Sequence, residues 1–199
     1  MGKVPWLIVI AGPNGAGKTT FANRLLPRLF AALPFINVDD LRREVIPATP
    51  TPDFAAGREA VRRMEALIAE RRGFVIETTL SGREHLNRLR RLKQDGWRIV
   101  LIYLGLRAVE NSLRRVAYRV RAGGHGVPDD VIRRRFSRSL EHLTAAVPLV
   151  DVAVVIDNSE RVPKIVAVSR DGAVEIVDAG RSPALTSSLA TLVQPVPDD

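Results

Sequence analysis

The sequence predicts an α/β fold in which a mostly parallel central sheet lies between two layers of helices. Apolar runs of strand length alternate with longer segments whose apolar residues recur every three or four positions, an order typical of parallel strands joined by helices. A glycine-rich turn connects the first apolar run to the first helical segment, and a strand–turn–strand pattern follows the last of these units. The length of 199 residues suits one domain with a proper core.

Composition restricts the class of protein. Apolar residues make up 46% of the chain and charged residues 26%, as in ordinary globular proteins. The apolar runs are too short to span a bilayer, so we expect no membrane partner. With no cysteine and three scattered histidines, the chain offers neither disulfides nor a cysteine or histidine metal cluster. A cleaved leader would remove the glycine-rich turn, so we expect a cytoplasmic location.

The formal net charge of +8 comes mainly from arginine, which supplies 26 of the 30 basic residues. Such charge attracts nucleic acid or membrane, or else serves an anionic substrate that a few arginines hold. Nucleic-acid sites add aromatic side chains that stack on bases, and the chain has only ten aromatic residues in all. We therefore favour the anionic substrate and do not expect nucleic acid as the partner.

The glycine-rich turn fits the phosphate-binding pattern G-x-x-x-x-G-K-[ST]. Its eight residues are Gly12, Pro13, Asn14, Gly15, Ala16, Gly17, Lys18 and Thr19. Glycines allow consecutive backbone N–H groups to point at phosphate oxygens, and the start of the following helix adds its positive dipole end. Lys18 can reach the β- and γ-phosphates, and the Thr19 hydroxyl can hold Mg²⁺. The sequence therefore predicts a P-loop NTPase or kinase fold that binds ATP with Mg²⁺ through these residues and Thr20.

Two aspartates follow the second predicted strand, residues 33–38. Asp39 and Asp40 stand beyond the carboxyl end of a strand, where ligands bind in open α/β sheets. One carboxylate there can accept a proton from a substrate hydroxyl, and the other can cap the helix that begins at Leu41. We assign Asp39 as the base, held at the strand end, and Asp40 as the cap, because a cap immediately precedes its helix.

A polar cluster follows the third predicted strand, residues 74–76. Its members are Glu77, Thr78, Thr79 and Ser81. One charge and three hydroxyls directly after a buried strand are costly unless they face a polar cleft, so we expect them to contact the acceptor substrate. A turn that caps the next helix would explain Thr79 or Ser81 equally well, but it explains Glu77 less readily.

Two arginine-bearing helices follow the fourth predicted strand, residues 98–104. The first covers residues 108–121 and the second begins at Asp129 and continues to about Ala146, with a glycine-rich turn between them. Mobile positive charge of this kind can close over phosphates and exclude water. A solvated basic hairpin explains the charge pattern equally well. We place the helical lid at about residues 107–146.

The last third of the chain completes the predicted sheet. A fifth strand leads into an Asp-Asn-Ser turn, where Asn158 could read an adenine edge, although turn chemistry also explains it. Residues 165–169 and 174–177 flank a tight turn as a C-terminal β-hairpin. Beyond Gly180, Ser, Pro and Thr accumulate without periodicity. We expect a single P-loop kinase domain over residues 1–180 and a loose tail over 181–199.

These motifs together resemble the zeta toxin family of P-loop kinases, over about residues 6–170. The matching features, in family order, are residues 12–19, Asn37-Val38-Asp39, residues 77–82, Arg119-Val120-x-x-Gly123-Gly124-His125-x-Val127-Pro128, Ile132-x-x-Arg135-Phe136-x-x-Ser139-Leu140 and Asp157-Asn158-Ser159. The phosphate-binding loop alone is generic. Its combination with Gly-Gly-His-x-Val-Pro is specific.

The resemblance implies transfer of the ATP γ-phosphate to a sugar hydroxyl, in the toxins the 3′-hydroxyl of UDP-N-acetylglucosamine. Carried over by position, Asp39 is the base, and Glu77 and Thr79 contact the acceptor. Lys18 and Thr19 hold phosphate and Mg²⁺. Arg119 and Arg135 clamp the phosphate, in a register that the neighbouring basic residues Arg121, Arg133 and Arg134 leave open.

The chain also departs from the plasmid-borne toxins. It is shorter and resembles the compact chromosomal branch of the family, in which sugar specificity differs. A small three-helix antitoxin that blocks the nucleotide site is compatible with the resemblance, but no residue of this chain implies it.

We therefore expect an ATP-dependent kinase of a sugar or nucleotide sugar. One rival is another small-molecule kinase, or a nucleic-acid 5′-hydroxyl kinase, which would bind polynucleotide tightly and with steep salt dependence. A second rival is a binding module in which ATP orders the lid for a protein partner. Such a switch needs no polar acceptor cluster opposite the P-loop, so residues 77–79 favour the enzyme.

Overall fold

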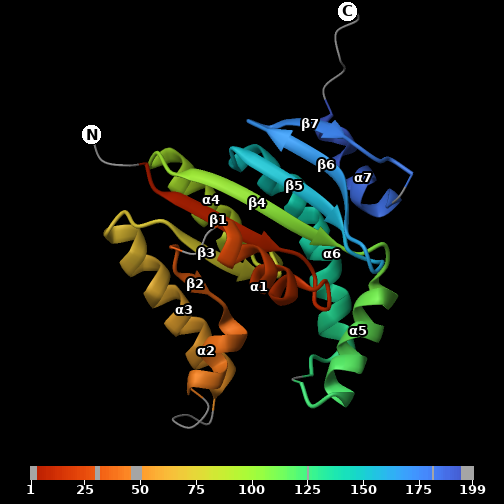
Figure 1. Cartoon of the computed structure of the whole chain (residues 1–199), viewed down its shortest axis with the longest axis horizontal. Coiled ribbons are helices and arrows are strands. Elements are labelled where there is room, and N and C mark those ends of the chain that lie inside the picture. Colours follow the sequence, from red (N-terminus) through yellow and green to blue (C-terminus); the bar gives the residue numbers. More distant parts are fainter. Residues whose placement is uncertain (1–3, 30–31, 46–50, 125, 181, 194–199) are drawn as a thin grey trace, which may run out of the picture.

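The computed structural model contains a seven-stranded sheet flanked by helices (Figure 1). It describes residues 4–29, 32–45, 51–124, 126–180 and 182–193, so His125 of the glycine-rich turn lies outside the described residues. The strand order is β2-β3-β1-β4-β5-β6-β7. The first five strands in this order run parallel, β6 pairs with β5 in antiparallel fashion, and β7 pairs with β6 in antiparallel fashion. The predicted fold class is confirmed, including the C-terminal hairpin.

The elements lie close to their predicted positions. The strands are β1 (Trp6–Ala11), β2 (Phe35–Ile36), β3 (Phe74–Thr78), β4 (Arg98–Gly105), β5 (Val152–Asp157), β6 (Lys164–Arg170) and β7 (Ala173–Ile176). The helices are α1 (Lys18–Leu29), α2 (Val38–Val45), α3 (Pro52–Ala69), α4 (Arg83–Gln94), α5 (Val109–Arg121), α6 (Asp129–Ala146) and α7 (Pro183–Leu189), with 3-10 turns η2 (Val147–Leu149) and η3 (Ala190–Leu192). In the described ranges, no helix is both long and apolar enough to cross a membrane.

The central strand β1 is apolar on both faces because each face is covered by helices. Leu7 and Val9 belong to a core that contains buried residues of α3, α4, α6 and α7. Ile8 and Ile10 belong to a second core, on the opposite face, with Ala22 of α1. Successive side chains of a strand point to opposite faces. The unbroken apolar run therefore marks a middle layer between two helical layers.

The register of β1 brings the site residues to one edge of the sheet. Ala11 at its end pairs with Thr78 of β3 and with Tyr103 of β4, while Ile10 pairs with Glu77. The carboxyl ends of β1, β3 and β4 thus lie side by side. In Figure 1, α2 and α3 project from one end of the lower border of the sheet, and α5 with α6 from the other.

Helix α5 ends in a hydrogen-bonded glycine turn. Gly123, at φ 85°, donates its N–H to Val120 O at 2.9 Å, and Gly124 donates to Arg119 O at 2.9 Å. These two bonds form a Schellman motif, in which the left-handed residue is usually glycine. A Cβ at Gly124 would lie 2.6 Å from Cγ of Arg119. The glycine pair therefore ends the helix and leaves room for the Arg119 side chain.

The expectation of a loose tail is wrong for residues 183–192, which form α7 and η3. Leu185 and Leu189 are fully buried in the core that α6 also joins. Pro183 stands at the helix start, where its missing N–H costs nothing. A helix of two turns gives too few apolar repeats for periodicity to reveal it. Leu185 packs on Gly105, where a Cβ would lie 2.4 Å from its methyl carbon.

We expect Leu185→Ala to lower the free energy of unfolding by about 3 kcal/mol, because it removes a buried side chain and leaves a cavity. Urea unfolding followed by circular dichroism measures the change. Ser187→Ala, on the exposed side of the same helix, is the control and should change stability by less than about 0.5 kcal/mol. Equal stability of the two variants would contradict the packing of α7.

Candidate functional site

The phosphate-binding loop connects β1 to α1 through three glycines in the left-handed half of backbone space. Their φ values are 141° at Gly12, 74° at Gly15 and 85° at Gly17. A Cβ at Gly12 would lie 2.0 Å from the carbonyl oxygen of Leu104, so the loop also packs directly on the backbone of β4. A side chain at these positions would be strained or would clash. The loop reaches its shape because glycine occupies all three.

Three side chains from distant segments brace this loop. Ser112 of α5 donates its hydroxyl to Asn14 O, and Arg115 donates to Gly15 O at 3.4 Å and to Ser159 O at 2.9 Å. Asn158 donates its amide to Ala16 O at 2.7 Å. Ser112 and the bracing role of Arg115 could not be predicted from the sequence, because no local pattern indicates a contact between segments about 100 residues apart.

Asn158 therefore contacts the phosphate-binding loop itself. Its amide nitrogen would lie 2.7 Å from a Cβ at Gly17, and its backbone N–H donates to Gly105 O at 3.0 Å. A contact between Asn158 and an adenine edge stays a prediction.

Lys18 lies over the loop with its ammonium group buried among charged neighbours. Its Nζ donates to Pro13 O at 3.0 Å. Burial lowers the pKa of Lys18, the carboxylates of Glu77 and Asp39 act in the opposite direction, and the charges of Arg119 and Arg135 lower it further. The charges of two carboxylates and two arginines thus act on the ammonium group. These five residues, all predicted as site residues, are linked electrostatically in the folded chain.

Glu77 lies at the end of β3 and faces the phosphate-binding loop. Thr19 donates its hydroxyl to the Glu77 carboxylate, with both oxygens at 3.0 Å, and Asn37 donates its amide to Oε2 at 2.8 Å. Burial raises the pKa of Glu77, and the charge of Lys18 and the Thr19 hydrogen bond act against that shift. Sequence analysis expected Glu77 on the acceptor side. The structure places it beside Thr19, the predicted metal ligand.

The assignment of Asp40 as the helix cap is wrong, because Asn37 caps α2. The Asn37 side-chain oxygen accepts the backbone N–H of Asp39 at 2.8 Å, as an N-cap residue does. Helix α2 begins at Val38, three residues earlier than predicted, and Asp40 pairs with Arg43. The signal was present, since asparagine is among the strongest N-cap residues. Asp39 lies exposed in the first turn, free of the capping role.

The hydroxyl groups of the β3–α4 loop, residues 78–82, differ in their exposure. Thr78 is buried and its Oγ1 lies 2.9 Å from His85 Nε2, so this hydroxyl faces α4, which disfavours its predicted contact with the acceptor. Thr79 and Ser81 are partly exposed, and their hydroxyls lie 2.8 Å apart. Leu80 between them is fully buried at φ 56°, a left-handed conformation that costs a non-glycine residue about 1–2 kcal/mol.

The arginines of α5 and α6 also differ in their exposure and contacts. Arg119 and Arg135 are partly buried, whereas Arg121 and Arg134 are exposed and Arg133 lies 3.5 Å from Glu110 on α5. Among the five, Arg119 and Arg135 are the two whose charges act on Lys18. This difference favours Arg119 and Arg135 as the clamping pair, an assignment that stays a prediction. Whether α5 and α6 move as a lid stays a prediction.

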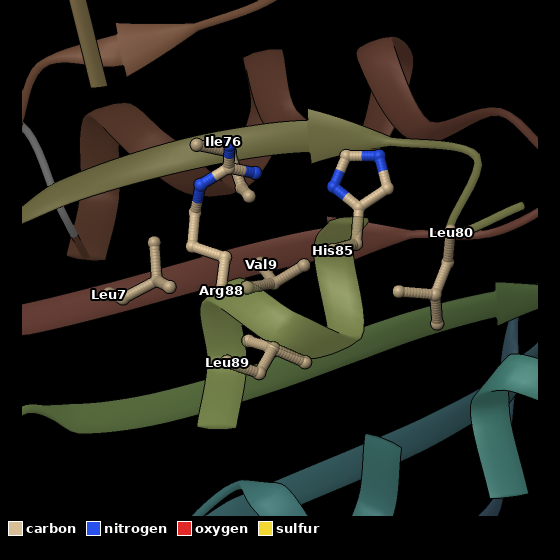
Figure 2. Close-up of a pocket in the computed structure, with 7 residues that line it drawn as sticks. All are labelled: Leu7, Val9, Ile76, Leu80, His85, Arg88 and Leu89. Carbon is tan, nitrogen blue, oxygen red and sulfur yellow. The ribbon is translucent and has the colours of Figure 1, made fainter. Parts of the chain in front are cut away.

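A narrow cavity lies on the face of the sheet that α4 covers, away from the phosphate-binding loop (Figure 2). Its lining residues are Leu7, Val9, Ile76, Leu80, His85, Arg88 and Leu89. A water-sized sphere does not fit inside it, so it is a packing gap and no ligand site. Figure 2 shows His85 on α4 beside the end of β3, with Leu80 in the loop that follows.

The chain is similar in sequence to a protein family and to a bacterial protein. A family model described as "AAA domain" (AAA_33) matches residues 7–146. An uncharacterized protein of Haemophilus influenzae is 33% identical over 133 residues, which cover 65% of this chain and 91% of that protein.

Two solved structures share the fold over nearly the whole chain. The AvrRxo1-ORF1:-ORF2 complex with ATP has a TM-score of 0.74 at 18% identity and covers 99% of this chain and 67% of its own. The PezAT chromosomal toxin–antitoxin system of Streptococcus pneumoniae has a TM-score of 0.64 at 16% identity, covering 100% and 81%. At these identities the likeness concerns the fold.

We expect Asn37→Ala to lower the free energy of unfolding by about 1–2 kcal/mol, because it removes the cap of α2 and a hydrogen bond to the partly buried Glu77. Urea unfolding provides the measurement. Asp40→Ala removes a partly exposed ion pair and no cap, so it should cost less than about 0.5 kcal/mol. A larger loss from Asp40→Ala than from Asn37→Ala would restore Asp40 as the cap.

Proposed function

We propose, since the chain belongs to the AAA domain family (AAA_33) and has a P-loop kinase-like fold, that it transfers the γ-phosphate of ATP to a hydroxyl group of a sugar or nucleotide sugar. The observation that carries this proposal is the phosphate-binding loop itself, where Lys18 bonds Pro13 O, Thr19 bonds Glu77, and two carboxylates and two arginines act electrostatically on the Lys18 ammonium group. A phosphoryl-transfer site needs a loop that holds the phosphates, positive charge that neutralises the transferring phosphoryl group, and a group that accepts the hydroxyl proton. These residues would supply all three.

The P-loop would hold the triphosphate. Gly12, Gly15 and Gly17 orient the loop backbone, and Thr19 and the exposed Thr20 lie in the first turn of α1, at its positive end. Bracing from α5 and from Asn158 keeps the loop in shape, so little order would have to be gained on binding. The AvrRxo1-ORF1:-ORF2 structure with ATP supports ATP as the nucleotide.

The residues present fit Mg²⁺. Thr19 and Glu77 offer a hydroxyl and a carboxylate with their oxygens 3.0 Å apart, and oxygen ligands are those that Mg²⁺ prefers. Among the described residues no group of three or more acidic, histidine or cysteine side chains could hold a metal by itself. Mg²⁺ usually relies on one or two protein oxygens and the substrate phosphates. When bound, it would neutralise charge on the β- and γ-phosphates.

Asp39 would accept the proton of the acceptor hydroxyl. As the hydroxyl oxygen bonds to the γ-phosphorus, the bond from that phosphorus to the β-phosphate bridging oxygen breaks, ADP leaves and the proton passes to the Asp39 carboxylate. Lys18, Arg119 and Arg135 would stabilise the negative charge on the transferring group. Asp39 suits the role because Asn37 caps α2 and leaves it exposed beside Lys18.

The acceptor would lie between Asp39 and the β3–α4 loop. Thr79 and Ser81 are partly exposed hydroxyls on that loop, suited to the hydroxyl and acetamido groups of an amino sugar. The resemblance to zeta toxins supports UDP-N-acetylglucosamine or a related nucleotide sugar. A shared fold with PezAT, described as a toxin–antitoxin system, supports a small antitoxin as a protein partner. An enzyme of cellular ATP and nucleotide sugars would work in the cytoplasm.

A direct test is incubation of the purified chain with Mg-ATP and a panel of UDP-sugars and free amino sugars, analysed by mass spectrometry. We expect one added phosphate on a UDP-N-acetyl sugar, and no product with Lys18→Ala. ATP binding without a phosphorylated product from any sugar would overturn the sugar assignment. The acceptor search would then move to nucleic acid or protein.

We expect Asp39→Asn to remove phosphate transfer while leaving ATP binding within about twofold, since the amide keeps the size of the side chain but accepts no proton. The initial rate at which the phosphorylated product forms measures phosphate transfer, and titration with a fluorescent ATP analogue measures ATP binding. Asp40→Asn is the matched control and should retain transfer within about threefold. Wild-type turnover of Asp39→Asn would exclude Asp39 as the base.

We expect Arg135→Ala and Arg119→Ala each to lower kcat by about 10³-fold if the arginine stabilises the transferring phosphate. The neighbours provide controls, because the exposed Arg134 and Arg121 should tolerate alanine with less than about threefold loss. Steady-state kinetics with saturating ATP measures the effect. A loss of kcat below tenfold in both Arg119→Ala and Arg135→Ala would show that neither arginine stabilises the transferring phosphate.

A further inference from the structure

Two histidines from different helices hold the β3–α4 loop. His85 of α4 places Nε2 2.9 Å from Thr78 Oγ1, and His142 of α6 places Nδ1 2.8 Å from Leu80 O. A carbonyl oxygen accepts hydrogen bonds and never donates them, so His142 must donate from Nδ1. Two of the three histidines in the chain thus fix a segment of five residues.

Leu80 is the residue that needs this support. It is fully buried and left-handed, at φ 56°, in a region that favours glycine. Its N–H donates to Thr78 Oγ1 at 3.0 Å, and its carbonyl accepts from His142. Side chains therefore satisfy both backbone groups of the strained residue, and the hydroxyl that receives the N–H is itself held by His85.

His142 also connects the loop to the helix that carries Arg135. The two side chains are seven residues apart on α6, so they lie on the same side of the helix. Between them, Ser139 Oγ lies 2.9 Å from Tyr103 Oη of β4, which fixes α6 to the sheet. One rigid helix thus joins the arginine near Lys18 to the loop that carries Thr79 and Ser81.

We propose that His142 and His85 are positioning residues that set the β3–α4 loop at a fixed place relative to Arg135, so that Thr79 and Ser81 meet the acceptor beside the transferring phosphate. This inference rests on the proposed function for its catalytic meaning. Its structural core, the fixation of Leu80 by the two imidazoles, stands on the hydrogen bonds alone.

The test exchanges each histidine for amides of two lengths. The Asn amide nitrogen is as many bonds from the backbone as Nδ1 of histidine, and the Gln amide nitrogen as many as Nε2. His142→Asn should therefore preserve the bond to Leu80 O, and His142→Gln should lose it. For His85 the order reverses, because Nε2 makes the contact: His85→Gln should preserve the bond to Thr78, and His85→Asn should lose it.

Steady-state kinetics and amide exchange provide the readouts. We expect His142→Gln and His85→Asn to raise KM for the acceptor by about tenfold, with KM for ATP within twofold. Exchange of the Leu80 N–H, followed by nuclear magnetic resonance, should accelerate by a similar factor. His142→Asn and His85→Gln should stay within about threefold of the wild type in both readouts.

Leu189→Ala is the control for general destabilisation, because it removes a fully buried side chain of α7, outside both α6 and the β3–α4 loop. It should lower the unfolding midpoint but leave KM for the acceptor and Leu80 exchange unchanged. Equal effects of Asn and Gln at both histidines, or equal rises in both KM values, would overturn the proposal in favour of simple packing.

A failure of the proposed function would look different. If the wild type phosphorylates no acceptor, the kinetic readout is absent for every variant, but exchange at Leu80 still decides whether the histidines fix the loop. If the chain is inactive but Leu80 exchange is faster in His142→Gln and His85→Asn than in the wild type, the histidines hold the loop without a catalytic role. If the chain is active but Leu80 exchange is the same in all four histidine variants, the histidines do not hold the loop and the proposed kinase activity stands.

Discussion

The site depends on one partly buried carboxylate, that of Glu77. It accepts hydrogen bonds from Thr19 and Asn37, and its charge acts on the pKa of Lys18, so it links three segments that are far apart in sequence. Removing a carboxylate from water is costly unless such partners surround it. The geometry at the start of α1, the end of β3 and the cap of α2 is therefore set together. Because Asn37 both bonds Glu77 and caps α2, the same residue fixes where Asp39 stands.

The phosphate-binding loop is likewise held in shape by contacts from distant segments. Its glycines permit a backbone shape and a close approach to β4 that other residues exclude, but glycine by itself is flexible. Contacts from Ser112, Arg115 and Asn158 remove that flexibility. These residues come from the helix after β4 and the turn after β5. The parallel sheet makes this bracing possible, since it gathers the carboxyl ends of its strands at one edge.

Strain and burial are concentrated around this edge. Leu80 is left-handed although it is not glycine, and both its N–H and its carbonyl are bonded by side chains. Burial lowers the pKa of Lys18 and raises that of Glu77, so the pair is shifted toward its neutral forms. Such features oppose stability and persist where surrounding structure over-determines them. Their place at the carboxyl edge sets this region apart from the regular packing of α7 on Gly105.

The parallel α/β core, the phosphate-binding loop and the position of nearly every strand and helix could be predicted from the sequence, because apolar runs, helical periodicity and glycine spacing are local signals. Four features emerge only in the folded chain. Asn37 caps α2 in place of Asp40, Thr78 turns toward α4, the charges of Arg119 and Arg135 act on Lys18, and residues 183–192 pack as α7 and η3. Each of these depends on a partner far away in the chain, or on two helical turns too short to show a period. No local pattern of residues carries that information.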